Sequence, residues 1–369
     1  MNTYPFDAIL LNGREVEIQQ ILSCTAIPKA DFEAATFAFI AEWFGTTEYF
    51  IQHTSGSTGP PKSITITRNQ IITSAKLTEQ ALNLTKGYNA LCCLSPAHIA
   101  GKMMLARCFI TGMKVISVTP SANPFMEIKP DQRIDFVALV PSQLHDILRS
   151  EQSGYFNTIK TAIIGGAILD AESQHKLQQY ECKFYATYGM TETVSHIALR
   201  LLNGRHASAD YTTLPGITIG IDNRSCLVIR WPNLSHPIIT NDVVELVDEK
   251  TFRWTGRWDN VINTGGTKVI PEALELKIEK IFQALGISQH FFVGSLPDQK
   301  YGHKIVLVIA GNVSRENIKL LHSRMHNMLS KHEIPKEILT GISFIFTENG
   351  KINRKATLDI TSGTGGQFS

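Results

Sequence analysis

Short apolar runs alternate with helical patterns through the first two thirds of the chain, and this alternation constrains the fold more than any other feature. The runs ALCCLS, KVISVT, DFVALV, TAIIGG and KFYATYG are typical of strands, and segments between them such as SQLHDILRS and DAESQHKLQQY are typical of helices. Alternation of this kind favours an α/β architecture with largely parallel sheets. We therefore predict an α/β fold whose large N-terminal domain has mostly parallel sheets flanked by helices.

The pattern changes twice further along the chain. After about residue 200, the closely spaced runs CLVIRW, PIITND, VVELVD and TFRWTG predict a β-rich subdomain. The turn-rich stretch TGRWDNVINTGG then leads into the helical pattern IPEALELKIEKIFQALG, and HFFVGS, KIVLVIAG and ISFIFT predict the strands of a small α+β unit. With a boundary at residues 256–260, we predict a large domain at 1–256, a small mobile domain at 257–360 and a flexible tail at 361–369.

Composition narrows the class of protein. The chain has 369 residues, is 43% hydrophobic and carries a net charge of +2, which argues against nucleic acid or an anionic membrane surface as a partner. No stretch has the apolar length that spans a bilayer, and the first residues lack a basic leader, so we expect a cytoplasmic protein without membrane insertion. The six cysteines lack paired C-x-x-C spacing, which predicts buried apolar residues rather than metal ligands. Nothing in the composition indicates an oligomeric state.

The stretch HTSGSTGPPKS, residues 53–63, has the composition of a phosphate-binding loop. Hydroxyls, glycines that admit close approach and a flexible positive charge come from Thr54, Ser55, Gly56, Ser57, Thr58, Gly59 and Lys62. It is not the loop of nucleotide hydrolases, because Pro61 stands where the second glycine of G-x-x-x-x-G-K-[ST] belongs and has no N–H. Ser and Gly composition alone also describes an ordinary surface linker.

A second cluster, YGMTET, suits a nucleotide monophosphate and its metal. It offers an aromatic ring at Tyr188, a glycine at Gly189, a hydroxyl at Thr191 and, at Glu192, a carboxylate for Mg²⁺. Upstream, the stretch IIGGAIL ends a predicted strand where a flat ring can lie against bare backbone, at Gly165, Gly166 and Ala167. Taken alone, YGMTET also describes a turn that leads into an exposed helix.

Two further stretches carry candidate residues. Asp242 in ITND can accept from two vicinal hydroxyls, and Arg257 adds donors for the same sugar, although a structural salt bridge is the alternative for either residue. Near the C-terminus, ENGKINRKA presents Lys351 in a turn between Asn349 and Asn353. Solvated lysines are far commoner than catalytic ones, so only the other motifs give Lys351 significance.

Taken in order, TSGSTGPPK, GGAIL, YGMTET, ITND, GRWDNVINTGG and NGKINRKA resemble the adenylate-forming superfamily of acyl- and aryl-CoA synthetases, luciferases and peptide-synthetase adenylation domains. The resemblance covers roughly residues 50 to 357 and extends through FFVGSLPDQKYG and HEIPKEI. It implies a two-step reaction in which a carboxylate attacks the α-phosphorus of ATP and a thiol then opens the acyl-adenylate. ATP, Mg²⁺ and CoA are therefore the implied cofactors and co-substrate, and a small carboxylic acid is the implied partner.

The resemblance also implies roles for single residues. The loop at 53–63 would clamp the β- and γ-phosphates with Lys62, Glu192 would hold Mg²⁺, and Lys351 would bridge the carboxylate and the α-phosphate. Asp259 matches the hinge between two domain orientations, and Gly265 and Gly266 would face the pantetheine channel. The chain departs from the family in two ways: Ser63 replaces the glycine usual after the loop lysine, and only about fifty residues precede the loop.

The stretch LSPAHIAGKMMLAR bears on the choice of acid. Amino-acid-activating relatives usually place an aspartate near this region, whereas this chain has His98 and Lys102. If the segment is helical, the two residues share one face and favour a second anion. The segment resembles that of o-succinylbenzoate–CoA ligases of menaquinone synthesis, whose dicarboxylate substrate activates one acid and keeps the other. The alternative is that His98 is a hydrogen-bonded core residue and Lys102 faces water.

Two other functions remain open from the sequence. The chain can be a different enzyme of the same fold, such as another aryl- or acyl-CoA ligase or a stand-alone adenylation domain. It can also be a non-catalytic nucleotide-binding protein, although such a protein would not need Lys351.

Overall fold

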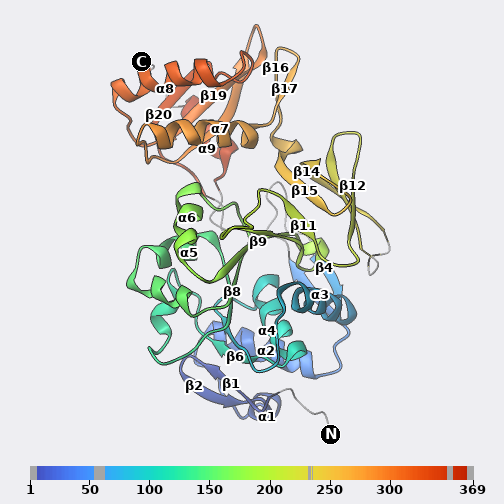
Figure 1. The fold of residues 1–369 in the computed structure, drawn as a ribbon. Helices are drawn as coiled ribbons and strands as arrows, with labels where there is room; N and C mark the ends of the chain where they lie inside the picture. Colours follow the sequence, from blue (N-terminus) through green and yellow to red (C-terminus); the bar gives the residue numbers. More distant parts are fainter. Residues whose placement is uncertain (1–5, 54–62, 232–233, 235, 347–351, 364–369) are drawn as a thin grey trace. The chain divides into compact units, whose positions relative to one another are not determined.

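The computed structural model describes residues 6–53, 63–231, 234, 236–346 and 352–363 (Figure 1). The chain divides into two compact units. The first comprises Met1–Thr218, Arg230–Ile238 and Asp248–Thr251, and the second comprises Ile219–Ile229, Ile239–Val247 and Phe252–Ser369. The predicted boundary at residues 256–260 stays a prediction. It includes the predicted hinge, and a hinge is defined by movement between two conformations and not by the packing in one of them.

The first unit is built on a mixed sheet, as the alternating pattern predicted. Its middle strands lie in the order β6 (Lys114–Ser117), β5 (Asn89–Cys92), β7 (Phe136–Leu139), β8 (Thr161–Ile164) and β9 (Lys183–Gly189), and each pairs with its neighbour in parallel. The chain runs outward from β5 to β6 and then returns to the other side of β5 as β7. The order of the strands therefore reverses between β5 and β7, and this switch point is where parallel α/β sheets usually bind ligands.

Shorter strands extend the sheet at both edges. At one edge β1 (Ala8–Leu11) pairs in parallel with β6, and β2 (Arg14–Glu17) pairs antiparallel with β1. At the other, β10 (His196–Leu201) pairs antiparallel with β9, and β11 (Tyr211–Thr213) pairs antiparallel with β10. A separate hairpin joins β3 (Tyr49–His53) to β4 (Ser63–Thr67). The helices of the unit are α1 (Ile18–Leu22), α2 (Asp31–Phe44), α3 (Arg68–Leu82), α4 (Ile99–Thr111), α5 (Pro141–Leu148) and α6 (Ala171–Lys176).

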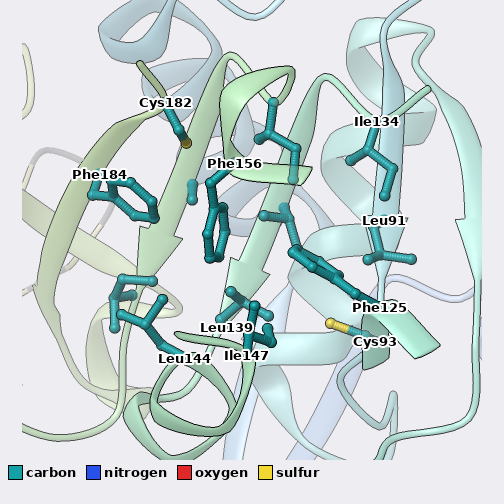
Figure 2. Close-up of a cluster of buried hydrophobic side chains, with 14 of the residues drawn as sticks. Leu91, Cys93, Phe125, Ile134, Leu139, Leu144, Ile147, Phe156, Cys182 and Phe184 are labelled. Carbon is teal, nitrogen blue, oxygen red and sulfur yellow. The ribbon is translucent and has the colours of Figure 1, made fainter. Parts of the chain in front are cut away.

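The core of the first unit explains why its middle strands read as continuous apolar runs. Every residue of β7 and β8 is buried, as expected for parallel strands covered on both faces. One face packs against α5 through Leu144 and Ile147, and Figure 2 shows this cluster of buried side chains. Phe156 lies in its middle, with its ring 4.8 to 5.5 Å from those of Phe125, Tyr180 and Phe184. These edge-to-face contacts are the favoured geometry for buried aromatic rings.

Four neighbouring strands belong largely to the second unit, in the order β12 (Thr218–Ile221), β13 (Cys226–Arg230), β14 (Ile238–Leu246) and β15 (Thr251–Arg257). The runs PIITND and VVELVD, which we predicted as separate elements, form the single strand β14. Its register against β15 shifts between Val243 and Val244, so a bulge interrupts the alternating pattern without ending the strand.

The second unit also contains a separate five-stranded sheet. It has the order β17 (Thr267–Val269), β16 (Ile262–Thr264), β19 (Gly302–Ala310) and β18 (Phe291–Asp298), with β20 (Glu337–Ile342) paired to β19. Its helices are α7 (Pro271–Ala284), α8 (Arg315–Met328) and α9 (Arg354–Gly363). Helix α9 includes the first three residues of the predicted tail, and residues 364–369 lie outside the described part of the chain.

The prediction that ISFIFT is a strand was wrong for most of its length, since β20 ends at Ile342. Phe344 packs instead against the buried residues Phe292, Val306 and Val308 without joining the ladder. The alternating apolar pattern therefore reports burial against a sheet and not strand pairing. Among the described residues, no helix combines the length and apolar character needed to cross a bilayer.

Phe156→Ala is expected to lower the free energy of unfolding of the first unit by about 3–5 kcal/mol, because it opens a cavity between three rings. Thermal or urea unfolding followed by circular dichroism measures the loss. Met126→Ala is the control, since Met126 is 63% exposed, and it should change the free energy by less than about 0.5 kcal/mol. Equal effects of the two substitutions would contradict the central place of Phe156 in the core.

Candidate active site

A cavity of about 240 Å³ lies where the middle strands of the first unit end. Its walls are formed at and just after the carboxyl ends of β5, β7, β8 and β9, by the start and one face of α4, and by the residues that lead into β10. The lining residues are Leu94, Ile99, Ala100, Arg107, Ala138, Leu139, Val140, Ile163, Gly165, Gly166, Thr187, Gly189, Met190, Thr191, Val194, Ser195 and His196. The cavity thus lies at the switch point of the sheet, with apolar walls and a few polar groups, as ligand sites commonly are.

Several residues predicted from the sequence meet at this cavity. Gly165, Gly166, Gly189 and Thr191 all line it, although they come from separate segments of the chain. Ala167 is exposed and lies outside the lining. Tyr188 is 9% exposed, does not line the cavity, and packs its ring 5.8 Å from that of Tyr211.

Glu192 faces a second cavity, of about 470 Å³, beside the hairpin of β3 and β4. It is exposed and belongs to a short 3₁₀ helix, Thr191–Thr193, directly after β9. The same cavity is lined by Thr65 and Gln70 from the segment that follows residues 54–62. Val194 lines both cavities, so the two cavities adjoin at this residue.

The predicted phosphate-binding residues lie outside the described part of the chain, and so does Lys351. They are Thr54, Ser55, Gly56, Ser57, Thr58, Gly59 and Lys62. The elements around them are described. Ser63 begins β4 and pairs with His53 of β3, so a strand stands between the segment and α3, an element that sequence reasoning missed. On the C-terminal side, a β-bridge joins Phe346 to Ile352.

The sugar-binding prediction concerns Asp242 and Arg257, which the second unit brings together. Asp242 is buried and accepts hydrogen bonds from Trp254 Nε1 at 3.2 Å and Arg257 Nη1 at 3.5 Å. The other terminal nitrogen of Arg257 donates to Asp259 at 2.7 Å, and Asn241 also donates to Asp259. The predicted hinge residue is therefore held by Arg257 and Asn241 in this conformation.

Gly265 and Gly266 form the turn of the hairpin between β16 and β17. Thr264 pairs with Thr267, and both glycines have positive φ, of 56° and 81°, as the favoured two-residue hairpin turn requires. This turn explains both glycines by backbone conformation. Their role at a pantetheine channel stays a prediction.

His98 and Lys102 do not line the cavity. His98 precedes α4 and is exposed, so the alternative that it is a core residue is wrong. Lys102 is half-buried in the first turn, and its backbone N–H donates to the His98 carbonyl at 3.2 Å. The two residues are neighbours, as the helical spacing predicted, and their role toward an anion stays a prediction.

Arg107 is the cation that does line the cavity, and sequence reasoning missed it. It lies on α4 and is 2% exposed. One terminal nitrogen donates to Ser195 Oγ at 2.6 Å, its Nε has no partner, and it has no ion pair with any described residue. Burial lowers the pKa of Arg107 to about 10, so the guanidinium stays charged at neutral pH. A lone arginine within the otherwise apolar run MMLARCF was the signal available in the sequence.

Gly189 allows the segment that carries Ser195 to approach β9. A Cβ atom at residue 189 would lie 2.4 Å from the Ser195 carbonyl oxygen and 2.5 Å from the Cα of His196. Both are backbone atoms, which cannot swing away as the end of a side chain can. We predicted Gly189 for close approach of a nucleotide, and the structure adds close approach of the chain itself.

Comparison with known proteins agrees with this geometry. A family model described as AMP-binding enzyme matches residues 31–231, and the chain belongs to this family. A crystal structure of an acyl-CoA synthetase (AMP-forming)/AMP-acid ligase II-like protein from Dyadobacter fermentans is 38% identical, with a TM-score of 0.62, and the match covers 92% of this chain and 97% of that one.

Two further similar proteins are named as ligases of succinylbenzoate. The 2-succinylbenzoate–CoA ligase of Staphylococcus aureus is 26% identical over 329 residues, which are 82% of this chain. The chain spans 65% of the length of that relative. The o-succinylbenzoate CoA synthetase of Bacillus subtilis, solved with its acyl-adenylate intermediate, is 16% identical with a TM-score of 0.74, and the match covers 95% of each chain. At that identity the likeness concerns the fold alone.

Gly189→Ala is expected to lower the free energy of unfolding of the first unit by about 1–3 kcal/mol, because the added methyl meets the backbone of residues 195–196. Gly154→Ala is the matched control, since a Cβ there meets nothing within 4 Å. Thermal unfolding of the two variants gives the comparison. A Gly189→Ala variant as stable as the control would show that the segment at residues 195–196 moves aside freely.

Proposed function

We propose that the chain is an AMP-forming acid–CoA ligase whose acid carries a second carboxylate, with o-succinylbenzoate as the expected substrate. The observation that carries this choice of acid is the buried guanidinium of Arg107, which has an unpartnered Nε and lines an apolar cavity. A buried charge without an opposite charge is strongly unfavourable, so an anionic ligand at this place would relieve it. The name of the Staphylococcus aureus ligase similar to this chain supports the same acid.

The nature of the lining also distinguishes the candidate acids. No aspartate or glutamate is among the described residues that line the cavity, so an α-ammonium group would meet Arg107 without a compensating carboxylate. This favours a diacid over an amino acid and makes a stand-alone amino-acid adenylation domain the second candidate. A simple monocarboxylic acid would leave the guanidinium unpaired.

The described residues fit ATP and Mg²⁺. Gly165 and Gly166 line the cavity without side chains, which suits a flat ring, and Asp242 with Arg257 supplies an acceptor and donors for a ribose. No cluster of three or more His, Cys, Asp or Glu side chains in the described ranges could hold a metal by itself. A lone carboxylate at Glu192 nevertheless fits Mg²⁺, which usually takes one or two carboxylates and completes its shell with phosphate oxygens and water.

In the proposed reaction, an oxygen of the acid's carboxylate forms a bond to the α-phosphorus of ATP, and pyrophosphate leaves. The sulfur of CoA then forms a bond to the acyl carbon, and AMP leaves. The chain's own residues bind and orient the reactants, because neither step requires a covalent intermediate with the protein. Arg107 would hold the carboxylate that does not react, Thr191 and Glu192 would face the phosphates, and Lys62 and Lys351 would neutralise developing charge.

The first test is pyrophosphate release with ATP and Mg²⁺ from o-succinylbenzoate, benzoate, a fatty acid and several amino acids, each with and without CoA. We expect release and thioester formation with o-succinylbenzoate only. Release with amino acids alone would favour the adenylation domain, and ATP binding without release from any acid would favour a non-catalytic nucleotide-binding protein.

Arg107→Met is expected to raise the KM for o-succinylbenzoate about 10- to 100-fold, because a hydrogen bond to a charged group contributes about 1.5–3 kcal/mol. The KM for ATP should change less than about twofold. Methionine keeps the length and apolar stem of the side chain, so the variant should fold. Lys102→Met is the control, since Lys102 does not line the cavity. A larger effect of Lys102→Met than of Arg107→Met would move the anion site to the pair predicted from the sequence.

A further inference from the structure

A chain of hydrogen bonds leads from the guanidinium of Arg107 away from the cavity to helix α3. Arg107 donates to Ser195 Oγ at 2.6 Å, and Ser195 Oγ lies 3.4 Å from Nδ1 of His196. Nε2 of His196 lies 3.1 Å from Oγ1 of Thr78, which donates to the Ser74 carbonyl at 3.0 Å. Thr78 and His196 are 118 residues apart in sequence, so these hydrogen bonds tie α3 to the first residue of β10.

The donors and acceptors at the two ends set the direction of every link. Thr78 uses its hydroxyl hydrogen on the Ser74 carbonyl, so its oxygen must accept from Nε2–H of His196. Arginine can only donate, so Ser195 Oγ accepts from Arg107 and turns its own hydrogen toward Nδ1 of His196. His196 is therefore the neutral imidazole that carries its hydrogen on Nε2.

The surroundings of His196 favour the same neutral state. The residue is 6% exposed, and burial together with the positive charge of Arg107 holds the pKa of the imidazole well below its usual value. A second hydrogen, on Nδ1, would face the hydroxyl that already accepts from Arg107. Protonation of His196 would thus reverse the hydrogen bond between Ser195 and His196 and would place one positive charge on each side of Ser195.

The backbone of Val194, directly before Ser195, has a strained conformation that helps to set the orientation of Ser195. Val194 has φ 67° and ψ −50°, and the N–H of Ser195 donates to the Thr193 carbonyl at 2.7 Å, which closes a γ-turn. Positive φ is unusual for a β-branched residue and is found where the surroundings enforce it. The hydroxyl of Thr193 donates to the Ser195 carbonyl at 2.7 Å and accepts from the Met190 N–H at 2.9 Å, and so holds the turn from both sides.

We propose that Ser195, His196 and Thr78 are positioning residues that fix the orientation of Arg107 and thereby set the preference for an acid with a second carboxylate. The inference rests on the proposed function, because it concerns how the same cavity selects its acid. Ser195 accepts from one terminal nitrogen of the guanidinium, and in this proposal the second carboxylate accepts from N–H groups that Ser195 does not use. Without the chain, the flexible arginine would lose orientational freedom on binding and would bind the second carboxylate less tightly.

The test compares the Kd of o-succinylbenzoate with that of 3-benzoylpropionate, which lacks the ring carboxylate, by isothermal titration. Ser195→Ala should raise the Kd of the diacid about tenfold and leave that of the monoacid within about twofold. Ser195→Thr should leave the Kd of the diacid near that of the unsubstituted protein, because threonine keeps the hydroxyl. If Ser195 has only a general structural role, Ser195→Ala should raise the Kd of both acids alike, and this result would overturn the inference.

Thr78→Val tests the far end of the chain, which does not line the cavity. It should raise the Kd of the diacid about two- to tenfold and leave the monoacid unchanged. Thr36→Val is the matched control, because Thr36 is also fully buried and its hydroxyl also donates to a carbonyl one helical turn back, that of Phe32 at 2.8 Å. This control should change neither Kd.

The ¹⁵N resonances of the His196 ring give a readout that does not depend on the acid. They should report the neutral form with hydrogen on Nε2 at pH 6 to 8, and an imidazolium or the opposite tautomer would overturn the inference. If Arg107→Met raises the Kd of the diacid but Ser195→Ala and Thr78→Val do not, the positioning role of Ser195 and Thr78 is overturned, whereas the proposed anion site is retained. If Arg107→Met also leaves both Kd values unchanged, the proposed anion site at Arg107 is overturned as well.

Discussion

Parallel pairing of β6, β5, β7, β8 and β9 is the constraint on which the rest of the first unit depends. Because these strands point the same way, their carboxyl ends meet at one edge, and the reversal between β5 and β7 opens a space there. Segments far apart in sequence consequently line one cavity. The continuous burial of β7 and β8 follows from the same arrangement, since both faces of a parallel sheet are covered.

The buried guanidinium of Arg107 departs from the otherwise apolar packing of α4. Proteins rarely leave such a charge without an opposite charge, because its removal from water is costly and only a partner offsets that cost. The described part of the chain supplies a neutral partner, Ser195, behind which stands the neutral imidazole of His196. The polar groups around the cation therefore orient it and leave its charge uncompensated, an arrangement that suits an anionic ligand.

Local sequence patterns predicted the strands of the middle sheet and the segments at their ends, because both depend on residues close together in the chain. Gly165, Gly189 and Thr191 were found in this way and do meet at the cavity. Arg107 was missed because its significance depends on the burial of the middle of α4, which no local pattern reports. The pairing of Thr78 with His196 was equally inaccessible, since only the folded chain brings the two residues together. His98 and Lys102 are neighbours, as their spacing predicted, but neither lines the cavity.

The placement of the cavity walls has a consequence for how a protein of this kind diversifies. Leu94, Val140 and Gly166 belong to loops that follow strands, and no strand register depends on their side chains. Arg107 and His196 belong instead to a helix and a strand, and they are linked through Ser195 to packing deep in the unit. Changes in the loops can therefore reshape the space for the acid one wall at a time, whereas a change in the charge that the cavity accepts requires several coordinated substitutions. Related enzymes should accordingly differ in the size of their acids more readily than in the charge of those acids.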